Sequence, residues 1–293
     1  MIDEISARLI LFSVIEVGNT FWINEINTHS ATAVYYKIIE GKKYLSQPNI
    51  SKLRYQIQSR DLAELKVEIK QANAFFITNE SIDWPNPLND LSVPPIGLVC
   101  SGNREALGTL EQSISIVGSR RPTNYGVTVA KKLAYEAAIF RVCVVSGGAY
   151  GIDTAAHMGA LAAGGITISV LAAGVNNLYP PENQGLFKQI SDSGLLLSES
   201  MPSERSAPYK FLVRNRLIAA LTKATVVVEA EFVSGSIRTA RDAAEIFRPV
   251  FAIPGEVTSP LSGGCHRLIS ERVADIATSL DEILEVITPL QLR

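Results

Sequence analysis

The sequence contains little that could hold a metal ion or build a disulfide framework. Its 293 residues include three cysteines, Cys100, Cys143 and Cys265, which are widely spaced and form no CxxC pair. Two of them lie in or beside apolar runs, a position typical of small buried hydrophobic residues rather than of redox or metal ligands. We therefore expect structural cysteines and no metal site.

Charge and long apolar runs are also scarce. Only 19% of the residues are charged and the net charge is −2, which argues against nucleic-acid binding through bulk charge. No window approaches 18 uninterrupted apolar residues, so no membrane span is expected. The start, Met-Ile-Asp-Glu-Ile, lacks the basic region of a secretion signal. The sequence thus predicts a cytoplasmic protein without a membrane partner.

Two glycine-rich nucleotide signatures are missing. A dinucleotide fold would have GxGxxG after its first strand, and a P-loop would have GxxxxGK[ST]. The turn after the first strand of the regular region instead reads Gly118-Ser-Arg-Arg-Pro-Thr-Asn-Tyr-Gly126. Nicotinamide and P-loop chemistry are therefore disfavoured, and we expect no cofactor.

The first 70 residues have a different pattern from the rest of the chain. Residues 50–69 contain no glycine or proline, and residues 61–70 interleave charged and apolar positions at helical spacing. Later residues alternate between short apolar runs and amphipathic segments. The sequence predicts a small, mostly helical N-terminal domain over 1–70 and one larger domain over 71–293.

The larger domain begins with a less regular segment. A short strand is expected at 74–78, followed by a proline-broken loop and a further strand at 93–100. Pro94 and Pro95 cannot donate to a ladder, so they suit an edge strand or the entry to a strand. We predict that the strand over 93–100 lies at an edge of the sheet.

From residue 112 onward, strand-like runs alternate with helical segments. Strands are expected near 114–118, 142–146, 166–172, 195–199, 225–230 and 249–253, and helices near 125–140, 153–163, 182–192, 212–222 and 236–246. This alternation is typical of a mostly parallel sheet that is covered by helices on both faces. The predicted fold class is therefore α/β, with ligands expected outside the carboxyl ends of the strands.

Several turns after these strands have the composition of anion sites. Gly118 ends a strand and precedes Arg120 and Arg121 at the start of a helix, where the helix dipole is also positive. The other turns of this kind contain Gly147 with Gly148, and Ser234 with Gly235 and Ser236. Anion sites at one edge of a sheet form an extended phosphate groove, which suits a polymer.

A basic segment precedes one of the predicted strands. Five basic residues and no acidic residue occur from Arg205 to Lys223. Such a patch is compatible with a defined anion site, but by itself it is weak evidence because most charge runs are solvated surfaces. Lys210 belongs to the patch and Phe211 follows it. The phenylalanine is either a core residue or a platform for base stacking, which tolerates any base sequence.

Arg214 and Arg216 flank Asn215 on the expected helix. Residues two apart on a helix do not share a face. One arginine can therefore reach an anion while the other forms an ion pair with a carboxylate such as Glu199 or Glu229.

Asp153 and His157 lie four residues apart on another expected helix, a spacing that can build an acid–base or metal pair. No third ligand has suitable spacing, so we interpret Asp153 as the helix N-cap and His157 as a satisfied helix residue. The serines at the glycine turns do not lie in GxSxG. We expect no catalytic residue, and we expect these turns to offer hydroxyl and backbone donors to phosphate.

Several of these motifs, with others, occur in a defined order. They are Ile116–Arg120 with Tyr125–Gly126, Ser146–His157, Tyr179–Asn183, Leu197–Ser200, Phe211–Ile218, Val228–Ala230 with Ser234–Ser236, and Ile253–Gly255. In this order they resemble the DNA-processing protein A (DprA/Smf) family of bacterial natural transformation, over roughly residues 72–285. The resemblance implies an extended Rossmann-like domain without enzymatic activity. It also implies a recombination mediator that binds and protects incoming single-stranded DNA, forms a homodimer and helps to load the RecA recombinase.

The candidate DNA-binding residues follow from the turns, the basic segment and the resemblance. They are Gly118, Ser119, Arg120, Arg121, Gly147, Gly148, Tyr150, Lys210, Phe211, Arg214, Asn215, Arg216, Ser234, Gly235 and Ser236. At Tyr150 the family usually has an arginine, so base stacking is expected there in place of a phosphate contact. Leu212 stands where proline is typical, and the first 70 residues match the family only faintly.

Two other functions are compatible with parts of the pattern. A nucleotide-processing enzyme of the phosphoribohydrolase type shares this fold class, but it would need a carboxylate beside a PGGxGTxxE turn, an order that Val228–Ser236 lacks. A pure interaction module would leave the anion turns without a role. Dimerisation is expected through the C-terminal half of the larger domain.

Overall fold

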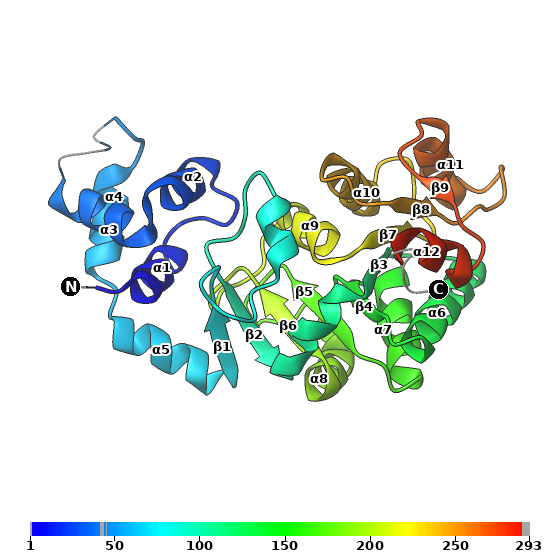
Figure 1. Cartoon of the computed structure of the whole chain (residues 1–293), viewed down its shortest axis with the longest axis horizontal. Helices are drawn as coiled ribbons and strands as arrows, with labels where there is room; N and C mark the ends of the chain where they lie inside the picture. The colour runs from blue at the N-terminus through cyan, green and yellow to red at the C-terminus, as the bar shows by residue number, and fades with distance from the viewer. Residues whose placement is uncertain (1, 42–43, 45, 289–293) are drawn as a thin grey trace.

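The computed structural model describes residues 2–41, 44 and 46–288, and within them nine strands form a single sheet (Figure 1). The strands are β1 (Ala74–Ile77), β2 (Leu98–Gly102), β3 (Ser113–Val117), β4 (Cys143–Ser146), β5 (Thr167–Leu171), β6 (Leu195–Ser198), β7 (Ala224–Val227), β8 (Val250–Ala252) and β9 (Asp275–Ile276). Their order is β1-β2-β6-β5-β4-β3-β7-β8-β9. Every pair from β6 to β9 is parallel, while β2 is antiparallel to both of its neighbours.

The connections create a switch point in the middle of the sheet. From β3 the chain steps outward through β4 and β5 to β6, and it then crosses back to β7 on the other side of β3. The loops that follow β3 and β7 therefore leave in opposite directions. In an open α/β sheet this divergence produces a crevice at the carboxyl ends of the two strands.

Helices cover both faces of the sheet, as the alternating pattern predicts (Figure 1). The helices are α1 (Glu4–Phe12), α2 (Thr20–His29), α3 (Ala31–Glu40), α4 (Ile50–Gln58), α5 (Leu62–Gln71), α6 (Asn124–Ile139), α7 (Ile152–Ala162), α8 (Gln184–Ser193), α9 (Pro208–Leu221), α10 (Gly235–Glu245), α11 (Gly263–Ser270) and α12 (Leu280–Ile287). Helices α9, α10 and α11 share one apolar cluster with one face of the sheet. Helices α6, α7 and α12 pack on the opposite face. The predicted α/β class with a mostly parallel sheet is confirmed.

The N-terminal helices α1–α5 pack against the part of the sheet that contains β6. Their apolar residues form one cluster with Leu196 of β6 and with Phe187 of α8. Phe12 and Phe76 meet edge to face, with ring centroids 5.1 Å apart, and Arg8 Nη1 donates to the Ile96 carbonyl at 3.2 Å. The domain boundary at residue 70 stays a prediction. Residues 1, 42–43, 45 and 289–293 of the two predicted domains lie outside the described part.

The structure corrects the prediction for residues 93–100. Strand β2 begins at Leu98 and lies between β1 and β6, so it is not an edge strand. Pro94 and Pro95 precede the strand, where a missing N–H does not interrupt a ladder. Strand β9 and the 3-10 helices η1 (Asn86–Asp90), η2 (Arg104–Glu111), η3 (Pro181–Asn183) and η4 (Pro260–Ser262) had no signal in the alternating pattern.

The three cysteines are buried, as expected. Burial raises the pKa of each thiol, to about 12 for Cys143 and Cys265. Protonated thiols of this kind pack as small apolar groups. Among the described residues, no helix combines the length and the apolar composition that a membrane crossing requires.

Candidate nucleic-acid interface

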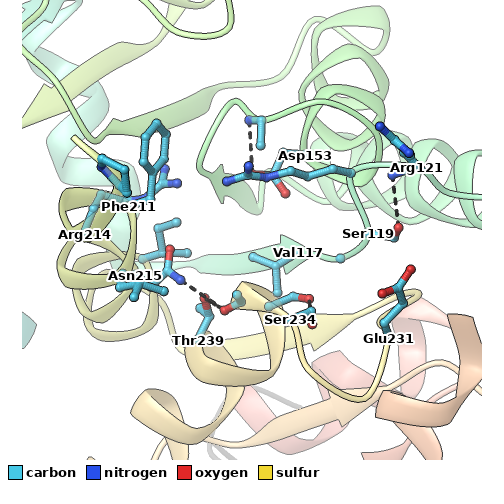
Figure 2. Close-up of a pocket in the computed structure, with 18 of the residues that line it drawn as sticks. Val117, Ser119, Arg121, Asp153, Phe211, Arg214, Asn215, Glu231, Ser234 and Thr239 are labelled. Carbon is cyan, nitrogen blue, oxygen red and sulfur yellow. Dashed lines mark hydrogen bonds between the residues drawn. The ribbon is translucent and has the colours of Figure 1, made fainter. Parts of the chain in front are cut away.

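A cavity of about 760 Å³ lies at the switch point, outside the carboxyl ends of β3 and β7 (Figure 2). Most of its wall comes from three segments, the turn after β3, helix α9 and the turn that leads into α10, and the rest comes from the turn after β4, the start of α7 and the loop after β5. Its lining consists of Val117, Gly118, Ser119, Arg120, Arg121, Ala149, Asp153, Tyr179, Pro208, Phe211, Leu212, Arg214, Asn215, Ile218, Glu231, Ser234, Gly235, Ser236 and Thr239. We call this cavity the groove.

The turn after β3 is anchored to the end of β7. Ser119 N donates to the Glu229 carbonyl at 2.6 Å. The Glu229 carboxylate accepts from Thr123 N at 2.8 Å and from Thr123 Oγ1 at 2.6 Å. Thr123 in turn caps α6, because its hydroxyl accepts from Gly126 N at 3.3 Å. The backbone N–H and hydroxyl of Thr123 are thus engaged by other protein groups. Arg120 and Arg121 take no part in these bonds and are exposed on the groove wall.

Two guanidinium groups converge inside the groove. Arg120 reaches across the turn, and its Cζ lies 5.5 Å from the centroid of the Phe211 ring. Arg214 on α9 is buried, with only 6% of its surface exposed. Its Nη1 donates to the Val170 carbonyl, while its Nε has no hydrogen-bond partner among the described residues. A buried polar group without a partner is costly, and Arg54, Arg216 and Arg248 each have such a nitrogen as well.

The pKa of Arg214 depends on its burial and on two neighbouring charges. Burial lowers its pKa to about 10; Asp153 opposes that shift and the nearby charge of Arg120 adds to it. With a pKa about three units above neutrality, the side chain remains charged at pH 7. Like charges that are held close together raise the local positive potential, and a phosphate oxygen would relieve their repulsion.

The turn after β4 differs from the prediction. Asp153 does not cap α7, which begins at Ile152 with Gly151 as its N-cap. Its carboxylate instead accepts from Gly147 N at 3.1 Å and from Ala149 N at 3.3 Å. The positive φ of Gly151, 79°, reverses the chain, so the carboxylate meets the turn before the helix. The Gly147 amide is therefore not free for phosphate, contrary to our expectation.

The two glycines of this turn have steric roles. A Cβ at Gly147 would collide with the guanidinium of Arg214, and a Cβ at Gly148 would collide with the Phe187 ring. Gly147 lines a small niche of about 10 Å³ next to the groove, and neither glycine lines the groove itself. The turn thus makes room for Arg214.

The start of α10 closes the groove on the β7 side. Ser234 is the N-cap, and its Oγ accepts from Ile237 N at 3.4 Å and lies 2.9 Å from Ser236 Oγ. Asn215 of α9 donates from Nδ2 to the Gly235 carbonyl at 3.0 Å. Both serines line the groove, so the positive end of the helix dipole adds to the two arginines.

Three of the sequence-predicted residues point elsewhere. Lys210 is buried and forms an ion pair with Glu204. Arg216 contacts both carboxylate oxygens of Glu199 at 2.7 Å, which is one of the two ion pairs that the helical spacing left open. The third residue is Tyr150, whose hydroxyl donates to Glu182. None of the three lines the groove.

His157 lies deep beside the groove and is fully buried. Its Nδ1 lies 2.7 Å from Thr167 Oγ1, and its Nε2 has no partner among the described residues. Burial, together with the charge of Arg214, lowers its pKa to about 3. The imidazole is therefore neutral at pH 7. Within the described residues, no cluster of three or more His, Cys, Asp or Glu side chains is arranged to hold a metal ion.

Sequence reasoning missed several groove residues. Tyr179, Pro208, Leu212, Glu231 and Thr239 line it. Tyr179 and Leu212 lie in motifs that the sequence does contain, namely Tyr179–Asn183 and Phe211–Ile218. Their side-chain directions depend on how the loop after β5 meets α9, which no local spacing encodes.

A mostly parallel sheet with helices on both faces and a groove at its switch point defines a Rossmann-like α/β protein. The family model described as DNA recombination-mediator protein A matches residues 75–288. The chain belongs to this family.

The relatives agree with this assignment. The DNA processing protein DprA of Streptococcus pneumoniae is 38% identical over 224 residues, which cover 76% of this chain and 77% of that protein. A putative DprA of Mycobacterium tuberculosis strain H37Rv is 46% identical over 176 residues, which cover 60% of this chain. That match spans 45% of the mycobacterial protein.

Two solved structures extend the likeness to three dimensions. DNA processing protein A from S. pneumoniae superimposes with a TM-score of 0.82 at 31% identity, covering 97% of this chain and 98% of that chain. The protein from Helicobacter pylori, whose structure concerns its single-stranded DNA binding mode, gives a TM-score of 0.66 at 30% identity. That alignment covers 74% of this chain and 97% of the H. pylori chain.

Proposed function

We propose that the groove binds single-stranded DNA through its phosphates and that the protein acts as a recombination mediator. The observation that carries this proposal is that Arg120, Arg121 and Arg214 line one cavity at the switch point of the sheet. The start of α10 adds backbone and hydroxyl donors on the opposite wall. The single-stranded DNA binding mode of the H. pylori relative supports the same assignment.

The arrangement favours binding without base-sequence preference. Guanidinium and helix-terminal donors contact phosphate oxygens, which carry no sequence information. A single strand is flexible enough to follow a groove at a sheet edge, and the phosphate contacts release counterions. With a net charge of −2, bulk charge does not attract DNA, so the attraction must come from local groups such as those of the groove.

The test is a salt titration of oligo-dT affinity for the wild type and Arg120→Ala, measured by fluorescence anisotropy. The logarithm of the affinity is expected to fall with log salt at about −0.7 per neutralised phosphate, and Arg120→Ala should reduce the slope by about that amount. Arg141→Ala is the control, because Arg141 is exposed between α6 and β4, at the amino end of β4 and outside the groove lining. Wild-type protein that fails to bind oligo-dT would overturn the proposal.

We further propose that a second copy of the chain and the RecA recombinase are partners. The loops after β7 and β8 present apolar side chains to solvent: Phe232, Val233 and Val257 are 55%, 88% and 90% exposed. Exposed apolar groups on adjacent loops suit a protein interface. Sedimentation of wild type against a Val233→Lys, Val257→Lys variant tests the homodimer, and RecA filament formation on coated single strands tests the mediator role.

The proposed function includes no bond cleavage. Asp153, a carboxylate on the groove wall, is engaged by two backbone amides. Incubation with nucleoside monophosphates and with labelled oligo-dT should return both substrates intact. Release of free base would instead support the phosphoribohydrolase alternative.

A further inference from the structure

The groove has an aromatic end that the phosphate contacts do not use. The Tyr179 and Phe211 rings lie 5.5 Å apart at an interplanar angle of 68°. Both rings line the groove and also the small niche beside it. Base stacking onto aromatic rings is the usual companion of phosphate contacts in single-strand binding.

The two rings differ in what they can offer to a base. Phe211 is half-buried and already contacts two groups, the guanidinium of Arg120 and the Tyr179 ring. Tyr179 is 45% exposed, and its hydroxyl forms no hydrogen bond with a described residue. Tyr179 is therefore the more exposed of the two aromatic residues.

Other exposed tyrosines near this edge are not placed for the same task. The hydroxyl of Tyr150 donates to Glu182, and that of Tyr125 donates to the Pro254 carbonyl at 2.8 Å. Neither of these two rings lines the groove. Tyr179 combines exposure, a position on the groove wall and contact with a ring that also touches a cationic groove residue.

We propose that Tyr179 is the residue that stacks on a DNA base, and that Phe211 is a positioning residue for Tyr179 and Arg120. This inference rests on the proposed function. The strand then lies with a base against Tyr179 while an adjacent phosphate meets Arg120 and Arg214. Because every base has a π-face, this contact adds affinity without selecting a sequence.

The experiment compares two ligands of equal charge: an oligo-dT and an oligomer of abasic deoxyribose units with the same number of phosphates. Tyr179→Leu keeps an apolar side chain and removes the π-face, whereas Tyr179→Phe keeps the ring. Tyr135→Leu is the matched control, because Tyr135 is 46% exposed on α6, outside the groove. Thermal unfolding of each variant checks that the fold is intact.

Tyr179→Leu should weaken oligo-dT binding by at least about 5-fold, the lower bound for one stacked base. Its affinity for the abasic oligomer should stay within about 2-fold of wild type, and Tyr179→Phe and Tyr135→Leu should bind oligo-dT as wild type does. Equal losses on both ligands, or no loss on oligo-dT, would overturn the role of Tyr179. If wild type binds neither ligand, the proposed function itself fails, so the two failures are distinguishable.

Discussion

Two arginines of α9 that are two positions apart perform different tasks. Arg214 lines the groove and donates to the Val170 carbonyl, whereas Arg216 lies outside the groove lining and forms an ion pair with Glu199. The side chains of Arg216 and Glu199 are 14% and 8% exposed. Burial raises the pKa of Glu199, and the charge of Arg216 and its hydrogen bonds oppose that rise. The pair therefore stabilises a charge that would otherwise be expensive to bury.

Replacing Arg216 should affect stability far more than DNA binding. Arg216→Gln leaves the Glu199 carboxylate buried without its cation, so the free energy of unfolding should fall by about 3–5 kcal/mol. Oligo-dT affinity of the folded protein should stay within about 2-fold of wild type. Urea unfolding and anisotropy measure the two quantities, and the double variant with Glu199→Gln should recover part of the loss. Unchanged stability with weakened binding would contradict this division of tasks.

At the scale of elements, the turn between β4 and α7 serves the groove mainly by positioning Arg214, although its Ala149 also lines the groove. Asp153 ties the turn to the start of α7 through two amide hydrogen bonds, and Gly147 leaves the volume that the guanidinium of Arg214 occupies. Gly147 is not among the glycines with positive φ, so its requirement is steric.

Gly147→Ala is therefore expected to displace Arg214 and weaken oligo-dT binding to about the level of Arg214→Ala. Gly185→Ala is the control, because a Cβ at Gly185 on α8 would meet no atom within 4 Å. Anisotropy titrations give the affinities, and circular dichroism confirms the helix content. Normal DNA affinity of Gly147→Ala would show that the position of Arg214 does not matter for binding.

The N-terminal helices have an electrostatic link of their own. Glu4 of α1 accepts from Ala31 N at 2.8 Å and from Thr32 N at 2.9 Å at the start of α3, and it pairs with Arg8 at 3.1 Å. Burial raises the pKa of Glu4, but the hydrogen bonds from Thr32 and Ala31 and the charge of Arg8 outweigh it. The pKa lies below its ordinary value of 4.5.

A lowered folded-state pKa means that this stabilisation is complete above about pH 5 and is lost as the pH falls through the folded pKa. Glu4→Gln should reduce the free energy of unfolding by about 1–3 kcal/mol at pH 7, the range for hydrogen bonds to a charged group. The difference in free energy of unfolding between Glu4→Gln and wild type should shrink as the pH falls from about 5 to about 3. Urea unfolding across this range measures it, with the exposed Glu64→Gln as control. A constant difference would contradict the assignment.

At the scale of the whole molecule, one apolar cluster joins the N-terminal helices to the sheet. It contains Trp22 of α2 together with residues of β6 and α8. Trp84 lies in the cluster on the α9 side of the sheet. Shared burial of this kind couples the unfolding of the parts that share it.

The two tryptophans, the only ones in the sequence, report on this coupling. Trp22→Phe leaves a probe beside the sheet, and Trp84→Phe leaves a probe among the N-terminal helices. In each variant, the urea midpoint from tryptophan fluorescence should coincide with the midpoint that circular dichroism gives for the same variant. An earlier transition for the Trp22 probe would indicate that the N-terminal helices unfold separately.

Local patterns were sufficient for most of the fold and for part of the groove. The predicted strand over 114–118 is β3 at Ser113–Val117, and the predicted helix over 125–140 is α6 at Asn124–Ile139. These agreements follow because period and turn chemistry are local properties. The edge position of residues 93–100 was wrong, because strand order depends on which distant strand provides a partner.

By itself the sequence determined the α/β class, the strand-end turns and the family. Only the tertiary structure decided which side chains meet: it placed Arg120 and Arg214 in one groove, turned Lys210 and Arg216 into ion pairs, and brought Tyr179 to Phe211. The physical reason is that backbone periodicity sets the elements. The direction and the partners of a long side chain are set by the packing between elements that are far apart in the sequence.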